Sequence, residues 1–116
     1  MTIKVNPDNP SPTWISPTLG NSWVNFGGSY TTAGYYKDNE GIVRLRGVIK
    51  NGTLSTAIFT LPVGFRPAAQ HYFISVGGAG LSAVLVGSDG VVQVGAYIAS
   101  GTNAYVSLDQ ISFSTW

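Results

Sequence analysis

Few residues of this 116-residue chain could support catalysis. His71 is the single histidine, there is no cysteine, and the five acidic residues are Asp8, Asp38, Glu40, Asp89 and Asp109. Three of these acids lie in sequences typical of turns, where a carboxylate commonly accepts hydrogen bonds from its own backbone. A glycosidase needs two carboxylates about 5–10 Å apart across a cleft, and turn acids at opposite strand ends seldom meet that condition. We therefore expect the protein not to be an enzyme.

Nucleophile and cofactor motifs are also missing. The segment Gly87-Ser88-Asp89-Gly90 lacks the Gly-x-Ser-x-Gly pattern of a nucleophile elbow and has the composition of a hairpin turn. The 15 glycines match no nucleotide-binding pattern. Asp38-Asn39-Glu40-Gly41 offers oxygen ligands without the spacing of an EF-hand, so only a weak calcium site built from several loops or chains stays open. We expect no cofactor and no zinc site.

Recognition by surface groups is the chemistry that the sequence supports best. Tryptophan and tyrosine rings stack on sugar faces, while loop Asn and Asp residues supply hydrogen bonds. We consider eight of the nine such rings, namely Trp14, Trp23, Trp116, Tyr30, Tyr35, Tyr36, Tyr97 and Tyr105. Most aromatic residues of a β domain belong to its core or to an interface. The candidate ligand-binding residues that we select are Trp14, Tyr35, Tyr36, Tyr97 and Tyr105.

The composition limits the classes of partner. A net charge of +1 gives no long-range attraction for nucleic acid, and no apolar run approaches the ~20 residues of a membrane span. Charged residues make up 9% of the chain, against about 25% in a typical soluble domain. Two interpretations stay open: other copies of the chain cover apolar surface, or Ser, Thr and Asn coat a secreted β domain. We expect neither nucleic-acid binding nor membrane insertion.

The strongest periodic signal lies in residues 41–50. Three apolar residues, Val43, Leu45 and Ile49, alternate there with three basic residues, Arg44, Arg46 and Lys50. A period of two sorts side chains onto the two faces of an extended strand, so the apolar set should face a core. The basic row has three interpretations: a solvated outer face, a row of ion pairs between subunits, or an anion site.

The rest of the chain also predicts strands separated by turns. Expected strands occupy residues 21–26, 35–37, 42–50, 56–61, 71–76, 81–86, 91–98, 105–108 and 111–116. The segments Asp38–Gly41 and Gly87–Gly90 have the composition of hairpin turns, and Phe65 should turn inward from a rigid loop. No segment has a helical period of useful length. The sequence predicts an all-β, antiparallel sandwich, similar to a jelly roll, with about nine strands.

The first nineteen residues differ from the rest. Pro7, Pro10, Pro12 and Pro17 forbid a helix there and disfavour a central strand. We therefore divide the chain into a proline-rich arm or linker, residues 1–19, and a β-sandwich domain, residues 20–116. Trp14 and Ile15 are expected to pin the arm to this domain.

Four segments resemble the C-terminal domain of phage and prophage tail fibre, tail spike and minor structural proteins. They are Asn-Ser-Trp-Val-Asn-Phe at 21–26, Tyr-Lys-Asp at 36–38 with Gly-Ile-Val-Arg-Leu-Arg-Gly at 41–47, residues 58–67, and residues 106–113. The most specific part is Leu-Pro-x-Gly-Phe-Arg-Pro at 61–67. The family often has Asp-Gly where this chain has Asp109-Gln110.

This resemblance implies a homotrimeric, jelly-roll-like tip at the end of a tail fibre, made in the host cytoplasm and carried on the virion. Such tips attach to bacterial surface polymers, so the implied partners are a cell-surface saccharide and an upstream fibre shaft. It transfers no catalytic residue. In such a trimer, the candidates for the subunit interface are Arg44, Arg46, Lys50 and Trp23.

Two other functions stay open at this point. A trimerisation and folding cap without a ligand would use the same fold, and a monomeric carbohydrate-binding module of a cell-wall enzyme would need one exposed aromatic platform. The oligomeric state separates the module from the other two. Staining of host cells separates the tip from the cap.

Overall fold

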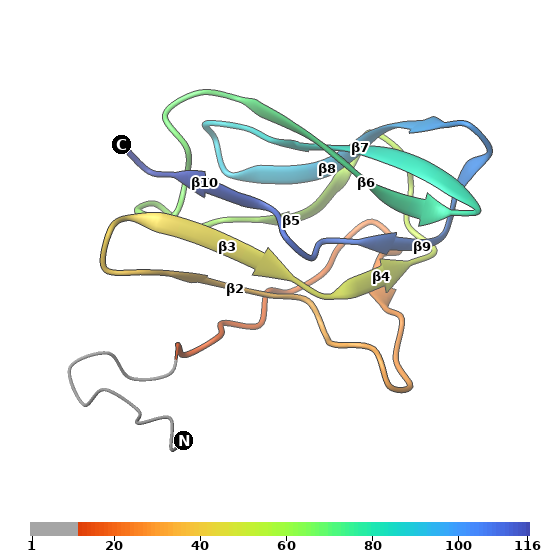
Figure 1. Cartoon of the computed structure of the whole chain (residues 1–116), viewed down its shortest axis with the longest axis horizontal. Coiled ribbons are helices and arrows are strands. Elements are labelled where there is room, and N and C mark those ends of the chain that lie inside the picture. Colours follow the sequence, from red (N-terminus) through yellow and green to blue (C-terminus); the bar gives the residue numbers. More distant parts are fainter. Residues whose placement is uncertain (1–11) are drawn as a thin grey trace, which may run out of the picture.

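Two antiparallel sheets face each other in the computed structural model, which describes residues 12–116 (Figure 1). The larger sheet has seven strands in the order β1-β4-β9-β6-β7-β8-β5, and the smaller has three in the order β10-β3-β2. The strands are β1 (Val24–Asn25), β2 (Gly34–Lys37), β3 (Ile42–Arg46), β4 (Val48–Lys50), β5 (Ala57–Thr60), β6 (His71–Gly78), β7 (Gly80–Val86), β8 (Val91–Ile98), β9 (Gly101–Ser107) and β10 (Ser112–Ser114). The predicted all-β sandwich is confirmed.

The core lies between the two sheets. Strands β7 and β8 supply Val84, Val86, Val92 and Val94, all of them without exposed surface. Because successive side chains of a strand point to opposite faces, their neighbours on β7 and β8 point away from the core. In Figure 1, β6, β7 and β8 form the upper side of the molecule, and β2 and β3 form the lower side.

The predicted strand at residues 42–50 is two strands in two different sheets. Val43, Leu45 and Ile49 are buried as expected, but β3 pairs with β2 and β10, whereas β4 pairs with β1 and β9. Gly47 joins them with φ = 110°. That angle lies where a Cβ atom is strongly disfavoured, so glycine allows the chain to cross from one sheet to the other without losing its alternation. The prediction of a single long strand was therefore wrong, although the residues predicted to face the core are buried.

The other strand boundaries differ less from the predicted ones. Strand β1 has only two residues because Asn21 and Ser22 both adopt positive φ, 54° and 70°, which ends extended structure before residue 24. The two predicted hairpins are confirmed: β2 pairs with β3, and β7 pairs with β8. Strand β9 begins at Gly101 rather than at residue 105.

The arm is anchored where it was expected to be. Ile15 forms an isolated bridge with Tyr35, in which the Ile15 amide donates to the Tyr35 carbonyl at 2.8 Å and the Tyr35 amide donates back at 3.0 Å. The ring of Trp14 packs edge-on against Tyr36 with 4.5 Å between centroids. Most of the predicted arm, residues 1–11, lies outside the described residues. Within residues 12–116, no helix is long and apolar enough to cross a membrane.

Candidate functional site

Two adjoining hollows form a groove on the larger sheet, beside the turn that follows β9. Their volumes are about 380 Å³ and 430 Å³, in the range of small-ligand sites. Val76, Ser107 and Asp109 line both hollows. We call the first the aromatic hollow; its other lining residues are Phe26, Tyr30, Val48 and Tyr105. We call the second the polar hollow; its other lining residues are Phe73, Ile74, Ser75, Gln110 and Ile111.

Three rings build the aromatic hollow from three parts of the chain. Phe26 follows β1, Tyr30 lies in the loop before β2, and Tyr105 lies on β9. The ring of Phe26 meets Tyr30 edge-on at 4.9 Å between centroids and Tyr105 at 6.3 Å. Tyr30 is 55% exposed and Tyr105 is 37% exposed, so both keep surface for a ligand. The Nζ atom of Lys50 lies 4.9 Å from the Phe26 centroid.

Asp109 stands where the two hollows meet and is held in place by backbone. One of its carboxylate oxygens accepts a hydrogen bond from the Gly47 amide at 2.9 Å, while the Leu108 amide donates to the Gly47 carbonyl at 2.7 Å. The turn that carries Asp109 requires φ = 69° at Gln110. A glycine suits that angle, which explains physically why the tail-protein pattern has Asp-Gly at this point. The crossing at Gly47 therefore fixes the carboxylate in the groove.

The polar hollow adds hydroxyl and amide groups. Ser75 donates a hydrogen bond from Oγ to the Ser107 carbonyl, and the Asp109 amide donates to Ser107 Oγ at 3.2 Å. Gln110 is exposed at the rim. The groove thus combines ring faces with a carboxylate, hydroxyls and an amide, which together can hold a polar ligand that has an apolar face.

The structure separates the five predicted ligand-binding residues. Tyr105 lies in the groove, whereas Trp14 and Tyr36 form a cluster on the smaller sheet, where the Arg46 guanidinium lies 4.1 Å from a Trp14 ring centroid. Tyr35 is 7% exposed and packs against Phe59 and Phe65, so its ring has no free face. The partly buried ring of Tyr97 packs against the core, and its hydroxyl is buried. Burial raises the pKa of both the Tyr35 and the Tyr97 hydroxyls.

The four predicted interface residues have contacts within the chain. Trp23 is 2% exposed, so its side chain belongs to the core and offers almost no surface to a neighbour. Arg44 pairs with Asp38 at 3.3 Å, Arg46 covers Trp14, and Lys50 covers Phe26. Because β3 and β4 belong to different sheets, the three basic residues do not form one row. An interface role for them stays a prediction.

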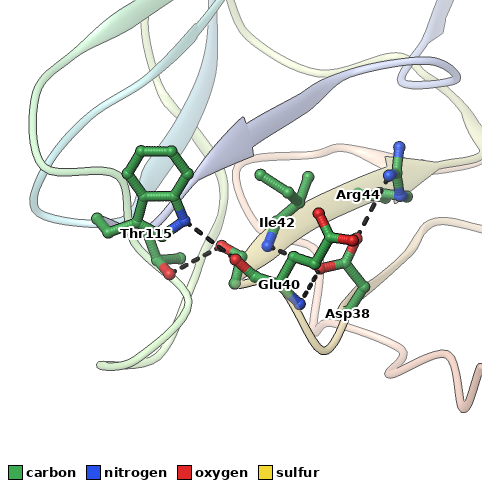
Figure 2. A network of polar contacts seen from close by, with 7 residues as sticks. Asp38, Glu40, Ile42, Arg44 and Thr115 are labelled. Atoms are coloured by element: carbon green, nitrogen blue, oxygen red, sulfur yellow. Dashed lines mark hydrogen bonds and ion pairs between the residues drawn. The ribbon is translucent and has the colours of Figure 1, made fainter.

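The turn from Asp38 to Gly41 is the other polar cluster (Figure 2). One Asp38 oxygen accepts hydrogen bonds from the amides of Glu40 and Ile42, at 2.9 and 3.0 Å, and the other faces Arg44. The C-terminal residues close over the turn: Thr115 Oγ1 donates to the Gly41 carbonyl, and Trp116 Nε1 donates to that of Glu40. Residues 12–116 contain no group of three or more His, Cys, Asp or Glu side chains placed to hold a metal ion.

We expect this turn to contribute to acid sensitivity. The amide of Ile42 is the main cause that lowers the pKa of Asp38, with further contributions from the Glu40 amide and from Arg44. A carboxylate with a lowered pKa in the folded state stabilises that state above its unfolded pKa, about 3.9, and loses this effect as the pH falls through the folded value. Asp38→Asn should therefore flatten the decline of the melting temperature below about pH 4. Thermal unfolding of both chains between pH 2 and 7 checks this, and parallel curves would contradict it.

Sequence reasoning missed most of the groove. Tyr30 was among the eight rings considered but not among the five selected, and Phe26 and Asp109 were not considered as ligand contacts. Segments far apart in the sequence make the groove, with Phe26 and Asp109 more than eighty positions apart, so no local pattern marks it. The one sequence signal that pointed to the groove was the resemblance to tail proteins. Of the segments that carry it, 21–26 ends at Phe26, and 106–113 contains Ser107 and Asp109, all of which line the groove.

The seven-on-three strand order and the groove define an antiparallel β-sandwich with a ligand-sized site on its larger sheet. A solved structure with this fold is the receptor-binding protein (gp15) of Listeria phage PSA, which matches with a TM-score of 0.72 and 18% sequence identity. The match covers 91% of this chain and 66% of that protein's chain. No family model matches the sequence, and no curated protein does. The resemblance to tail proteins is thus confirmed at the level of the fold.

Proposed function

We propose that the chain is a non-enzymatic tip domain of a phage tail protein, on the virion, that attaches to the bacterial host surface. Its ligand is a cell-surface saccharide, and it acts as a homotrimer on an upstream fibre shaft, so that three sites bind together with increased avidity. The fold that it shares with a phage receptor-binding protein supports the general role.

The groove around Asp109 carries the proposal for a saccharide. A sugar ring has an apolar face that packs on aromatic side chains and hydroxyls at its edge that need hydrogen-bond partners. Tyr30 and Tyr105 supply exposed rings, and Asp109 supplies a carboxylate that backbone hydrogen bonds already orient. Such preorganisation reduces the entropy that binding must overcome.

Removing both exposed rings should weaken attachment. We expect the double variant Tyr30→Ala/Tyr105→Ala to bind host cells and purified cell-wall polysaccharide at least about 5-fold more weakly, because each ring contributes roughly 0.5–1.5 kcal/mol. The measurements are decoration of host cells by the fluorescent chain and titration calorimetry with the polysaccharide. Trp116→Ala is the matched control, since that ring is 79% exposed and lies outside the groove, and it should bind as the parent chain does.

The outcomes separate the alternatives. Unchanged binding of the double variant would refute the groove as the site, and Trp14→Ala then tests the aromatic cluster on the smaller sheet. A trimer that decorates no host cell would indicate a folding cap. Release of oligosaccharides from host polysaccharide by the purified chain would overturn the non-enzymatic role.

A further inference from the structure

The outward side of β6, β7 and β8 is mostly apolar. On β6, Tyr72, Ile74 and Val76 point outward and are 71%, 65% and 47% exposed. Leu81 on β7 and Ile98 on β8 are 39% and 41% exposed. The pairs Val76↔Leu81 and Leu81↔Ile98 place Val76, Leu81 and Ile98 side by side across the three strands. We call these five residues the outer apolar face.

No charge interrupts this surface. The three strands contain no Asp, Glu, Lys or Arg in their 23 residues (8 in β6, 7 in β7 and 8 in β8). Ala83 and Ala96 are also outward and are paired across β7 and β8 beside Ile74. Leu85 and Gln93 are paired outward across the same two strands next to Tyr72, and Gln93 is polar but uncharged. Isolated apolar residues on a surface are ordinary, but a contiguous uncharged face of large side chains usually marks an interface.

We infer that further copies of this chain pack against the outer apolar face. The inference rests on the homotrimer proposed above and assigns its contact surface. This surface differs from the predicted interface residues Arg44, Arg46, Lys50 and Trp23. The five side chains expose on the order of 500 Å², most of the ~800 Å² per partner of a standard interface, and the rim of the sheet supplies the remainder. The low charge content of the chain, 9%, agrees with a surface that is covered in the assembled state.

Other occupants fit this face less well. A saccharide needs hydrogen-bond partners, and among the five residues only the Tyr72 hydroxyl supplies one, so sugar hydroxyls would lose hydration without replacement. An anionic lipid surface needs cations, which the three strands lack. In a cyclic trimer, the outer apolar faces of three copies can meet around the axis, where these three strands would bury no charge.

Packing on this face also brings a neighbour to the groove. Val76 belongs to the outer apolar face and also lines both hollows, and Ile74 lines the polar hollow. A copy seated on the face therefore lies at the edge of the ligand site and narrows its entrance.

Light scattering on the 116-residue chain tests the inference. The parent chain should have a mass about three times 12.2 kDa, that of the homotrimer. Ile74→Lys should raise the dissociation constant at least about 10-fold, because it places an unpaired charge in an apolar contact. Val63→Lys is the matched control: Val63 is 83% exposed in the loop between β5 and β6, and this variant should assemble as the parent does. Circular dichroism checks that both variants fold.

A second measurement does not depend on a disruptive substitution. The chain has no cysteine, so Ile74→Cys and Val63→Cys each introduce a single thiol. The thiol at position 74 should react with a maleimide at least about 10-fold more slowly than the one at position 63, and dilution to monomer should remove the difference. A monomeric parent chain would overturn the assembly itself. An oligomer in which Ile74→Lys assembles normally, or in which both thiols react equally, would overturn the face while the assembly stands. The saccharide site is tested separately, by the Tyr30→Ala/Tyr105→Ala variant.

Discussion

Gly47→Ala is expected to lower the free energy of unfolding by more than about 3 kcal/mol. At φ = 110°, any Cβ atom at this position is strained. An added Cβ would also lie 2.5 Å from the Ala33 Cα atom and 2.6 Å from its nitrogen. These are backbone atoms, so no change of rotamer relieves the overlap. Relief would require the crossing between β3 and β4 to move, and with it the amide that holds Asp109. Urea unfolding of both chains measures the loss.

Gly64→Ala separates the two causes. Gly64 also has a positive φ, 97°, but a Cβ atom added there has no neighbour within 4 Å. We expect this variant to lose only the conformational term, about 1–2 kcal/mol. Equal losses in the two variants would show that backbone conformation alone explains the Gly47 effect and that Ala33 yields without cost.

Gly52→Ala is expected to be nearly as damaging for a different reason. Gly52 is buried under the ring of Trp23, and a Cβ atom would overlap the Cγ, Cδ2 and Cε2 atoms of that ring. Trp23 is 2% exposed and cannot swing into solvent without leaving the core. The expected loss is about 3 kcal/mol or more, through displacement of the ring. Chemical denaturation, followed by the fluorescence of the tryptophans, measures it.

A double-mutant cycle tests the contact directly. Trp23→Ala alone should cost about 3–5 kcal/mol, since it removes a large core side chain. In that background, Gly52→Ala should cost about 1 kcal/mol or less, because the overlapping ring is gone. Additive losses would contradict the proposed overlap and would indicate that position 52 needs glycine for another reason.

The strand periodicity was enough to predict the fold class and much of the core. Alternation at residues 43–49 identified the buried side of that stretch, and the turn residues between β7 and β8 fixed their hairpin. The sequence did not reveal that Gly47 sends the chain to the other sheet, because alternation continues through the crossing. The strands therefore divide into sheets of seven and three, and local patterns cannot distinguish this division from the divisions found in other sandwiches.

The site was far less predictable than the fold. Residue type alone cannot separate a tyrosine such as Tyr35, buried between Phe59 and Phe65, from Tyr30, which is exposed over a hollow. The burial of Tyr35 follows from packing against β5 and the loop after it, and the position of Tyr30 follows from packing that brings the loop before β2 beside β9. The outer apolar face was similarly hidden. Its alternation with the inner residues of β6 is plain, but only the sandwich determines which side faces the core.

The attachment of both chain ends determines how the domain would carry mechanical load. Residues 14 and 15 are bound to β2, and Thr115 and Trp116 are bound to the turn between β2 and β3, so both described ends meet the smaller sheet. Tension entering through the N-terminal segment is first resisted by the two Ile15–Tyr35 hydrogen bonds and by β2 and β3. The outer apolar face lies on β6, β7 and β8 of the larger sheet, whereas the groove takes Tyr30 from the loop before β2 and Asp109 from beside Gly47. A pull on the arm would therefore reach the groove before it reaches the outer apolar face, so load on the fibre would act on ligand binding before it acts on assembly.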